Sequence, residues 1–336
     1  MLWYEQSSVG NIVSSRVRLA RNLKSVPFPS KLDLKRLREV NTKICDAVMG
    51  CGFRQKLRLV DMETLGEPEA FAMVERHIIS PKFAMCREGR FLIISDDESI
   101  SIMIGEEDHL RFQVILPGQR LKEALELCDE LETLVSKRLE FAFDERLGYL
   151  TECPTNLGTG MRASVMLHLP LLERSGELKS LSDAASKIGL TFRGFYGEGS
   201  ESKASLYQLS NQITLGVSES TAIENLKNIA MQISEREQGL TDTIDSMQLY
   251  DTVCRSLGVL KYAGLLTTKE MMRHLSVLML GIRAKIVSGN LRPMEIFITQ
   301  QPAMIKRIHG DCTPDERDIL RAKAVRRVLR SIEPLD

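Results

Sequence analysis

Segments with the pattern of β-strands are confined to the first two thirds of the chain, and this asymmetry limits the possible folds more than any other feature. We expect strands at Phe91–Ser95, Ser99–Ile104, Leu110–Leu116 and Leu206–Val217, and helices at Asp33–Cys51, Gln119–Leu139, Ser220–Arg236, Asp245–Leu257, Thr268–Val287 and Pro314–Ser331. Because the strands come in runs and do not alternate regularly with helices, the pattern predicts an α+β fold with a largely antiparallel sheet. We place this first domain at residues 1–239 and a smaller, all-helical domain at residues 240–336.

The composition is that of an ordinary globular protein. The 336 residues include 45 basic and 45 acidic side chains, so the formal net charge is zero and bulk electrostatic binding of nucleic acid is not favoured. No apolar run approaches the ~20 residues of a membrane span, and Glu5 follows the apolar N-terminus too early for a signal peptide. The seven cysteines are scattered without a CxxC pair, and no cluster of metal ligands stands out. We therefore expect reduced cysteines, a cytoplasmic location, no resident metal, and neither a membrane nor a direct nucleic-acid partner.

Two arginines near the N-terminus are the first candidates for a functional site. In the segment Ser14-Ser15-Arg16-Val17-Arg18, the two arginines are two residues apart, so on a strand they point to the same face. Neighbouring guanidinium groups repel each other unless an anion lies between them, and polyphosphate fits their fork geometry. The alternative interpretation is a pair of solvated arginines on an edge strand.

An acidic segment lies between two expected strands. Glu106, Glu107 and Asp108 are followed by His109 and Arg111, and the three carboxylates repel one another. If the strand runs through this segment, Glu107, His109 and Arg111 share a face, and a carboxylate beside an arginine could orient a cationic substrate next to a bound phosphate. A tight surface turn is the alternative interpretation.

Two glycine-rich segments complete the set. We expect the loop from Cys153 through Gly158 and Gly160 to lead into an apolar helix, with Arg162 in its first turn and an anion at its N-terminus. Cys153 is a candidate for a thiol of lowered pKa, although an ordinary glycine turn and a small apolar cysteine explain the segment equally simply. The second segment, residues 193–200, has the spacing GxxGxG, which is neither a dinucleotide fingerprint nor a P-loop.

Taken in order, these segments resemble the catalytic domain of the ATP:guanido phosphotransferases, the creatine and arginine kinase superfamily. The motifs are SSRVR at 14–18, EEDHLR at 106–111, CPTNLGTGMRAS at 153–164 and RGFYGEGSE at 193–201. The chain is most similar to the bacterial protein arginine kinases, because it lacks the helical domain that precedes the first arginine pair in animal phosphagen kinases. Its tail also contains RDILRA at 317–322, similar to a phosphoarginine-binding motif of that branch. One departure is Gly105, where relatives usually have Asn.

The resemblance implies an ATP site. Five arginines are expected to hold the phosphates of MgATP: Arg16, Arg18, Arg111, Arg162 and Arg193. The other implied nucleotide contacts are Ser14, Ser15, Val17, His77, Ala163, Ser164, Val165, Met166, Gly194, Phe195, Tyr196, Gly197 and Glu198. Phosphoryl transfer depends mainly on positioning and charge stabilisation, which an arginine cluster supplies.

The acceptor is a guanidinium group, and this makes the chemistry demanding. Its pKa above 12 places the neutral nucleophile roughly 7 kcal/mol or more uphill at pH 7. We expect Glu107 and Glu198 to clamp the guanidinium and to accept its proton as the N–P bond forms, with Glu106 as a supporting charge and Cys153 as an orienting thiolate.

The C-terminal motif has a separate role in this interpretation. Arg317 and Arg321 are four residues apart on one helical face, and with Asp318 and Ala322 they are expected to form an allosteric phosphoarginine site. The residues alone favour a solvated basic helix, with a nucleic-acid patch as the second alternative.

The predicted function is a protein-arginine kinase that uses ATP and Mg²⁺. A phosphagen kinase acting on free arginine and an inactive adaptor that binds phosphoarginine are the alternatives. By resemblance we also expect a homodimer, a zinc-binding activator protein, marking of clients for a Clp unfoldase–protease, and regulation of a heat-shock repressor.

Overall fold

A single antiparallel sheet organises the first part of the molecule. The computed structural model describes all residues except 7–9, 195–203, 242–243, 245, 290 and 336. Among the described residues, eight strands form the main sheet in the order β2-β3-β4-β5-β1-β8-β10-β9, and every pairing in it is antiparallel. Their bounds are β1 Ile12–Arg21, β2 Leu57–Asp61, β3 Phe91–Ser95, β4 Ile100–Ile104, β5 Leu110–Pro117, β8 Met161–His168, β9 Leu190–Gly194 and β10 Leu206–Asn211. The predicted α+β fold with an antiparallel sheet is confirmed.

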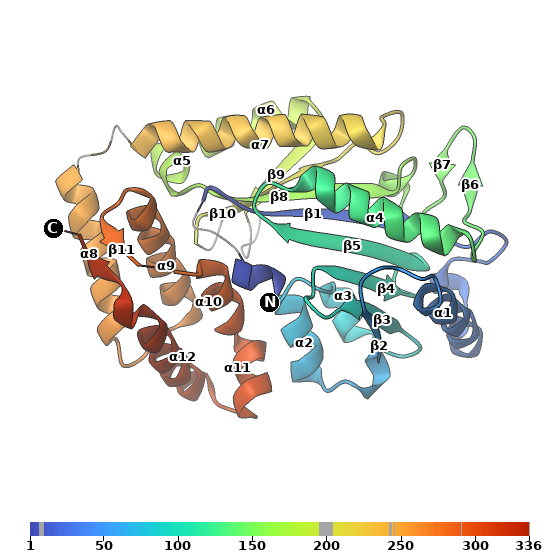
Figure 1. Ribbon diagram of the computed structural model, residues 1–336, viewed down its shortest axis with the longest axis horizontal. Coiled ribbons are helices and arrows are strands. Elements are labelled where there is room, and N and C mark those ends of the chain that lie inside the picture. Colours follow the sequence, from blue (N-terminus) through green and yellow to red (C-terminus); the bar gives the residue numbers. More distant parts are fainter. Residues whose placement is uncertain (7–9, 195–203, 242–243, 245, 290, 336) are drawn as a thin grey trace.

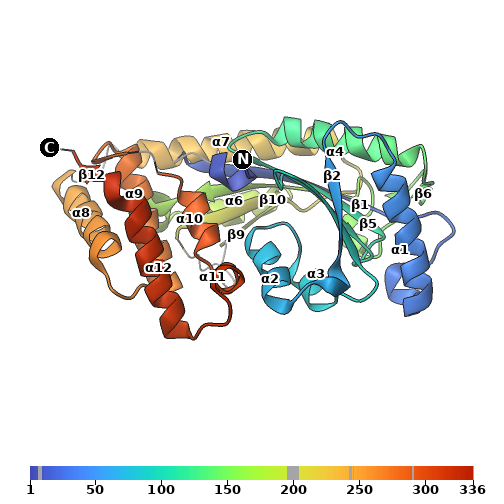
Figure 2. The ribbon, with the colours of Figure 1, turned by 60° about the horizontal axis from the view of Figure 1, so that its bottom comes forward.

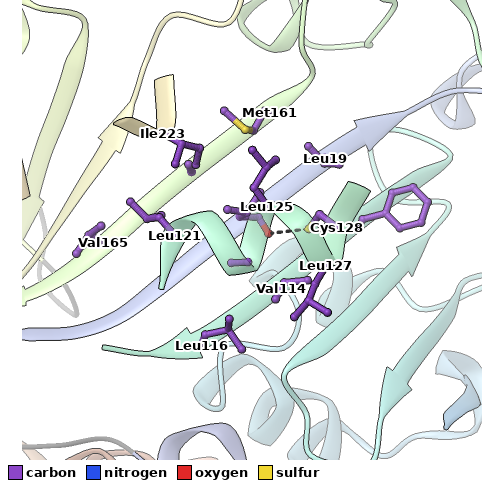
Figure 3. Packing of buried hydrophobic residues seen from close by; sticks show 14 of the residues in the cluster. Leu19, Val114, Leu116, Leu121, Leu125, Leu127, Cys128, Met161, Val165 and Ile223 are labelled. Atoms are coloured by element: carbon purple, nitrogen blue, oxygen red, sulfur yellow. Dashed lines mark hydrogen bonds between the residues drawn. The ribbon is translucent and has the colours of Figure 1, made fainter. Parts of the chain in front are cut away.

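Helices cover one face of this sheet along its whole length. Helices α4 (Leu121–Ser136) and α7 (Glu219–Thr241) lie across the strands on one side, with α1 (Leu34–Met49) at the β2–β4 end (Figures 1 and 2). The buried apolar residues of α4, including Leu121, Leu125 and Leu131, recur at the spacing that places them on one face of the helix. These side chains pack against residues of β1, β5 and β8 such as Leu19 and Val165 (Figure 3).

The opposite face is covered only in part. At the β3–β4 end, α2 (Glu67–Glu75) and α3 (Pro81–Met85) close it with a second apolar cluster that includes Met73, Phe83 and Leu92. Short helices α5 (Pro170–Ser175) and α6 (Leu178–Lys187) and the hairpin β6 (Phe143–Asp144) and β7 (Gly148–Tyr149) lie at the periphery. The middle strands therefore present one face to the α4–α7 core and leave their other face for polar residues.

The C-terminal part is made mainly of helices. They are α8 (Ser246–Tyr262), α9 (Thr268–Arg283), α10 (Pro293–Thr299), α11 (Pro302–His309) and α12 (Pro314–Val328). The two-residue strands β11 (Val287–Ser288) and β12 (Glu333–Pro334) pair with each other beside them. Capping boxes begin α9 at Thr267 and α12 at Thr313. Helix α7 continues to Thr241, so residue 239 lies within a helix, and the division at that residue stays a prediction.

The two parts of the chain share an apolar core. Trp3 and Tyr4 at the N-terminus and Met166 of β8 belong to the same buried cluster as Met271 and Leu275 of α9. The C-terminal helices are therefore packed directly against the N-terminal segment and the sheet, and not only attached through α7.

Two expected elements differ from the structure. Met161–His168 is strand β8 and not a helix, because alternate residues such as Ala163 and Val165 face the α4–α7 core while Arg162 and Ser164 do not. The expected strand 206–217 ends at Asn211, whose side chain accepts a hydrogen bond from the amide of Ala163 (2.7 Å) and donates to the carbonyl of Met161 (3.1 Å).

A buried polar network crosses the contact between β8 and α9. His168 is fully buried, with Nε2 2.7 Å from the Ser276 hydroxyl and Nδ1 accepting a hydrogen bond from Arg283 at 2.7 Å. Burial, together with Arg283, lowers the pKa of His168 well below its ordinary value. The carboxylate of Glu237 on α7 accepts hydrogen bonds from the amides of Leu171 and Leu172 beside this network. The fold thus requires a neutral imidazole at this contact.

This network predicts a specific acid sensitivity. The unfolded chain binds a proton at residue 168 below pH ~6.5 and the folded chain does not, so stability is lost as pH falls through that value. The variant His168→Gln has no titrating group at this position. We therefore expect the free energy of unfolding of the unmodified protein, measured relative to that of His168→Gln, to fall by about 1.4 kcal/mol per pH unit between pH 6 and pH 5. Urea denaturation at several pH values measures this difference, and parallel pH profiles would contradict it.

Candidate active site

The five arginines predicted to hold phosphate gather on the uncovered face of the sheet. Arg16 and Arg18 of β1 alternate with Val17 and Leu19, which belong to the α4–α7 core. Arg18 lies opposite Arg162 of β8 and Gln113 of β5, and Arg111 is two residues from Gln113 on the same face. Arg193 of β9 lies opposite Gln208, which accepts a hydrogen bond from Arg16 at 2.8 Å. Four strands, β1, β5, β8 and β9, thus bring all five arginines to one face.

A cavity of about 420 Å³ opens on this face. Its lining includes three of the arginines, Arg16, Arg18 and Arg111, together with His77 and Ile79 from the segment after α2. Arg16 is oriented by Gln208 and by the Ser164 hydroxyl at 3.4 Å. The cavity is therefore cationic on the sheet side, whereas the side of α2 and α3 carries apolar residues together with the carboxyl group of Glu75.

The electrostatics of the cavity fit an anionic ligand. Burial and the neighbouring Arg111 lower the pKa of Arg16 to about 10. Burial and the charges of Arg16, Arg111 and Arg162 lower the pKa of Arg18 well below its ordinary range. The Nε of Arg18 is a buried donor with no hydrogen-bond partner among the described residues. A polyphosphate would satisfy this donor and neutralise the mutual repulsion of the arginines.

His77 lies at the rim between α2 and the sheet. Its backbone is in the left-handed region (φ 62°), and its carbonyl accepts a hydrogen bond from Gln113 at 2.8 Å. Burial and the charge of Arg16 lower the pKa of His77 to about 3, so the ring is neutral, and its centroid lies 6.1 Å from that of the Trp3 ring. Sequence reasoning without the family resemblance gives no signal for this residue.

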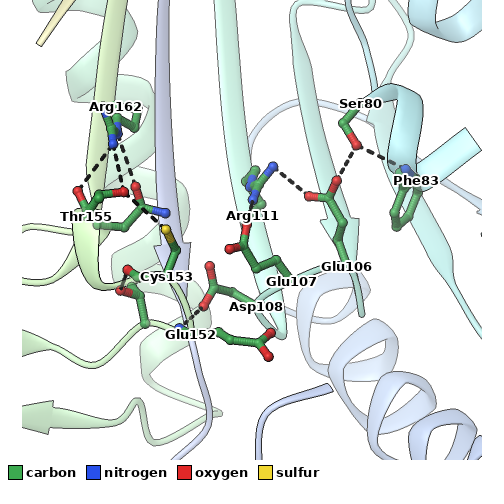
Figure 4. A network of polar contacts seen from close by, with 12 residues as sticks. Ser80, Phe83, Glu106, Glu107, Asp108, Arg111, Glu152, Cys153, Thr155 and Arg162 are labelled. Carbon is green, nitrogen blue, oxygen red and sulfur yellow. Dashed lines mark hydrogen bonds and ion pairs between the residues drawn. The ribbon is translucent and has the colours of Figure 1, made fainter. Parts of the chain in front are cut away.

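The acidic segment forms a turn between β4 and β5. Arg111 is paired with Glu106 at 2.6 Å and with Glu107 at 3.1 Å, and Glu106 also accepts a hydrogen bond from the Ser80 hydroxyl (Figure 4). The Glu106 side chain is only 3% exposed, whereas that of Glu107 is 31% exposed. Glu107 is thus the carboxylate of this pair that an incoming substrate can reach.

The expectation of one face shared by Glu107, His109 and Arg111 is wrong for His109. Strand β5 begins only at Leu110, so both Glu107 and His109 belong to the turn, and the His109 ring is buried against Asn22. The turn nevertheless brings Glu107 to Arg111.

Two buried residues that sequence reasoning overlooked hold the turn. The Asp108 carboxylate accepts hydrogen bonds from the side-chain amide of Asn22 at 2.6 Å and from the backbone amide of Glu152 at 2.9 Å. Glu152 directly precedes Cys153, so Asp108 fixes the acidic turn and the cysteine loop relative to each other. The sequence indicated only that three acids repel, and nothing in it pointed to Asn22.

Gly105 starts the turn in a left-handed conformation (φ 80°). A Cβ atom there would lie 2.2 Å from the side-chain nitrogen of Asn41. The Gly105 carbonyl accepts a hydrogen bond from Arg90 at 2.7 Å, and its amide donates to the His109 carbonyl at 3.0 Å. Asn41 therefore occupies the space that a side chain at residue 105 would need, and the turn is held on both sides.

The cysteine loop lies beside Arg162. The Cys153 sulfur is 3.1 Å from the Thr155 hydroxyl, which also accepts a hydrogen bond from Arg162 at 3.0 Å (Figure 4). Gly158 (φ 102°) packs so closely that a Cβ atom would lie 2.2 Å from the Thr214 carbonyl. Because β8 follows this loop, the expected helix N-terminus as an anion site is wrong, and Arg162 instead reaches the site from a strand.

The remaining predicted residues fall into three groups. Ser14, Ser15, Val17, Ala163, Ser164, Val165 and Met166 lie on β1 and β8, and of these Val17, Ala163 and Val165 face the α4–α7 core, away from the cavity. Gly194 ends β9. Phe195, Tyr196, Gly197 and Glu198 lie outside the described residues.

The C-terminal motif lies at the first turns of α12. Arg317 is partly exposed and donates to the Cys312 carbonyl at 3.0 Å. Arg321 is only 1% exposed, donates to the carbonyls of Gln300 (2.9 Å) and Leu266 (2.7 Å), and pairs with Asp318. Ala322 is buried. In this arrangement Arg317 and Asp318 are partly exposed, while Arg321 stabilises the helix packing.

Among the described residues there is no group of three or more His, Cys, Asp or Glu side chains suited to a metal ion. The same part of the chain contains no helix long and apolar enough to cross a membrane. The seven cysteines are free thiols.

Two family models match the chain. Residues 39–240 match the ATP:guanido phosphotransferase C-terminal catalytic domain, and residues 246–336 match the protein-arginine kinase McsB C-terminal domain. A protein-arginine kinase of Halothermothrix orenii is 43% identical over 94% of this chain and 92% of its own length, and one of Caldanaerobacter subterraneus is 40% identical over 97% and 98%.

The chain belongs to the protein-arginine kinase family. It is a phosphotransferase with the guanido phosphotransferase catalytic domain, and ATP use follows from that family. The solved structure of a lombricine kinase has the same fold, with a TM-score of 0.62 at 24% identity over 72% of this chain and 71% of that one.

The crowding of Arg18 predicts a trade-off between stability and binding. In Arg18→Met we expect the free energy of unfolding without nucleotide to be unchanged or raised, because a buried cation next to three arginines is removed. The stabilisation by MgATP, about 2.7 kcal/mol at 100 times Kd for the unmodified protein, should be largely lost.

Thermal denaturation with and without MgATP measures both effects. Arg36→Met, on the exposed surface of α1, is the matched control and should keep the full stabilisation. Undiminished stabilisation of the Arg18 variant would remove this residue from the nucleotide site.

Proposed function

We propose that the cationic face and the acidic turn form one active site for phosphorylating arginine side chains of proteins. The observation that carries this proposal is the placement of Arg111, which lines the arginine cavity and pairs with both Glu106 and Glu107. A single side chain thus joins the surface suited to a triphosphate with the carboxylates suited to a guanidinium group. Transfer between two such ligands requires this adjacency.

ATP would lie with its phosphates against Arg16, Arg18, Arg111, Arg162 and Arg193, and with its base towards His77. The arginines hold the phosphates in place and stabilise the charge that develops during transfer. Mg²⁺ would arrive with ATP and be held by phosphate oxygens, where it neutralises charge.

The substrate guanidinium would lie between Glu107 and Cys153. Glu107 is accessible, and its pairing with Arg111 orients it towards the phosphates. Because a carboxylate is too weak a base to deprotonate a free guanidinium, the proton passes to Glu107 as the N–P bond forms and the bond between the γ-phosphorus and the leaving oxygen breaks. Glu198 is proposed as the second carboxylate, Glu106 as a supporting charge, and the Cys153 thiolate as an orienting group.

The accessible position of Glu107 also supports a protein-borne arginine over the free amino acid. A phosphagen kinase acting on free arginine and an inactive phosphoarginine-binding adaptor are the competing functions, and one assay separates all three.

We expect Glu107→Gln to lower kcat by about 10²–10⁴-fold, the range of general acid–base catalysis, with the Kd for ATP changed far less. The assay follows acid-labile phosphate on an arginine-rich protein and on free arginine in parallel. Glu123→Gln on the exposed surface of α4 is the matched control and should keep full activity.

Several outcomes would contradict the proposal. Undiminished transfer by a folded Glu107→Gln variant would exclude this role of Glu107. Preference for free arginine would favour the phosphagen kinase, and the absence of ATP turnover in the unmodified protein would favour the adaptor.

We further propose that Arg317, Asp318, Arg321 and Ala322 form a regulatory phosphoarginine site. Arg317 is the accessible cation of this motif and Asp318 the accessible carboxylate, so the phosphate would meet Arg317 first and the guanidinium N–H groups would meet Asp318. Arg321 would bind the phosphate only by giving up its hydrogen bonds to the carbonyls of Gln300 and Leu266.

Titration of free phosphoarginine tests this site. We expect its Kd to rise at least tenfold in Arg317→Ala and in Arg321→Ala, because each loses a charge-assisted hydrogen bond. Arg330→Gln, an exposed arginine later in the same chain segment, should bind normally. Equal affinity in all variants would reject the assignment.

The cellular setting is proposed by resemblance to the family. It comprises a cytoplasmic homodimer that marks proteins for a Clp unfoldase–protease, acts on a heat-shock repressor and is switched on by a zinc-binding activator. The free state of all seven cysteines supports a reducing compartment.

A further inference from the structure

Helices α2 and α11 pack side by side, although more than two hundred residues separate them in the chain (Figures 1 and 2). Glu75, the last residue of α2, points at the first turn of α11. One oxygen of its carboxylate accepts a hydrogen bond from the amide of Ala303 at 2.9 Å, and the other accepts one from the amide of Met304 at 2.7 Å. Both donors are amides that a helix start otherwise leaves unpaired, so this carboxylate fixes α11 to α2.

The same contact forms part of the wall of the nucleotide cavity. Glu75 and His77 line the cavity together with Arg16 and Arg18, and Gln301, directly before α11, lines it from the C-terminal part. A change in the position of α11 relative to α2 would therefore alter the shape of the cavity. The C-terminal helices contribute to the site even though the five arginines all lie on the sheet.

The segment that leads into α11 is tied to α12. Arg321 donates from Nε to the carbonyl of Gln300 at 2.9 Å, and Gln300 precedes the cavity residue Gln301. Arg321 and Arg317 are also close enough to act electrostatically on Glu75, where they oppose the effect of burial on the pKa of this carboxyl. Glu75 thus responds both to the position of α11 and to the charge on α12.

We propose that Glu75 is a positioning residue that couples the arginines of α12 to the nucleotide cavity. An anion bound by Arg317 and Arg321 would compete with the Gln300 carbonyl and weaken the positive field at Glu75. The start of α11, and with it Gln301, would then shift relative to His77. The identity of that anion as phosphoarginine rests on the proposed function, whereas the coupling of Arg317 to the cavity through Glu75 does not.

A double-mutant cycle tests the coupling without any anion. The Kd for ADP in the presence of Mg²⁺ is measured by calorimetry on the full chain for the unmodified protein, Arg317→Gln, Glu75→Gln and the double variant. We expect Arg317→Gln to change the Kd at least threefold when Glu75 is present and less than 1.5-fold when it is Gln. Equal effects in both backgrounds would overturn the proposal.

A matched control separates the coupling from long-range charge. Arg330→Gln removes the same charge from an exposed position beyond the end of α12. This variant should change the Kd for ADP less than 1.5-fold. An effect as large as that of Arg317→Gln would mean that any lost positive charge on the C-terminal part changes the affinity for ADP, and it would overturn the role of Glu75.

Because Glu75 also holds α2 and α11 together, a second variant tests the coupling with Glu75 left in place. Arg321→Lys keeps the charge but loses the planar fork that reaches two carbonyls. With Glu75 intact, it should change the Kd for ADP at least threefold, and an unchanged Kd would overturn the proposal.

Phosphoarginine forms a separate arm of the experiment. If it binds, reciprocity requires that ADP and phosphoarginine change each other's Kd by the same factor, and this factor should fall to about one in Glu75→Gln. A factor that persists in that variant would overturn the proposal. If phosphoarginine does not bind the unmodified protein, the regulatory site fails, while the double-mutant cycle still decides the role of Glu75.

Discussion

Repulsion among arginines on one face of a rigid sheet is the constraint on which the site depends. Arg16, Arg18, Arg111 and Arg162 are held on neighbouring strands by backbone pairing and by the apolar core on the other face, so they cannot separate to relieve the repulsion. The Nε of Arg18 is buried and has no hydrogen-bond partner in the part of the chain that the structure describes. A bound polyphosphate, as proposed for this site, would relieve the repulsion and so favour highly charged anions over neutral ligands.

The acidic turn complements this arrangement because its carboxylates differ in exposure. Glu106 and Asp108 are buried, where Glu106 is bound by Ser80 and Arg111 and Asp108 by Asn22 and the amide of Glu152. Glu107 also pairs with Arg111, but its side chain is partly exposed. Three adjacent acids that look equivalent in the sequence therefore take different positions in space. Burial and the hydrogen bonds of Ser80, Asn22 and Glu152 make the distinction, and these donors come from distant parts of the chain.

What the sequence could predict follows from the range of the interactions involved. The antiparallel sheet, the helical C-terminal part and the common face of Arg16 and Arg18 follow from local periodicity, and all are found in the structure. The helix expected after the cysteine loop was wrong because Met161–His168 is apolar enough for either element, and only pairing with β1 and β10 decides for a strand. Likewise, the burial of Arg321 could not be predicted, since its partners Gln300 and Leu266 lie in connections between other helices, far from it in the chain.

The order of the strands gives the arginines unequal mechanical support. Arg16 and Arg18 lie on β1, which is paired on both sides, whereas Arg193 lies on β9, the last strand of the sheet among the described residues. An edge strand opens at a lower free energy than a central one, so Arg193 has a more mobile backbone support than Arg16 and Arg18. A polyanion bound as proposed would then be held rigidly at the middle of the sheet, while its other end could enter and leave at the border.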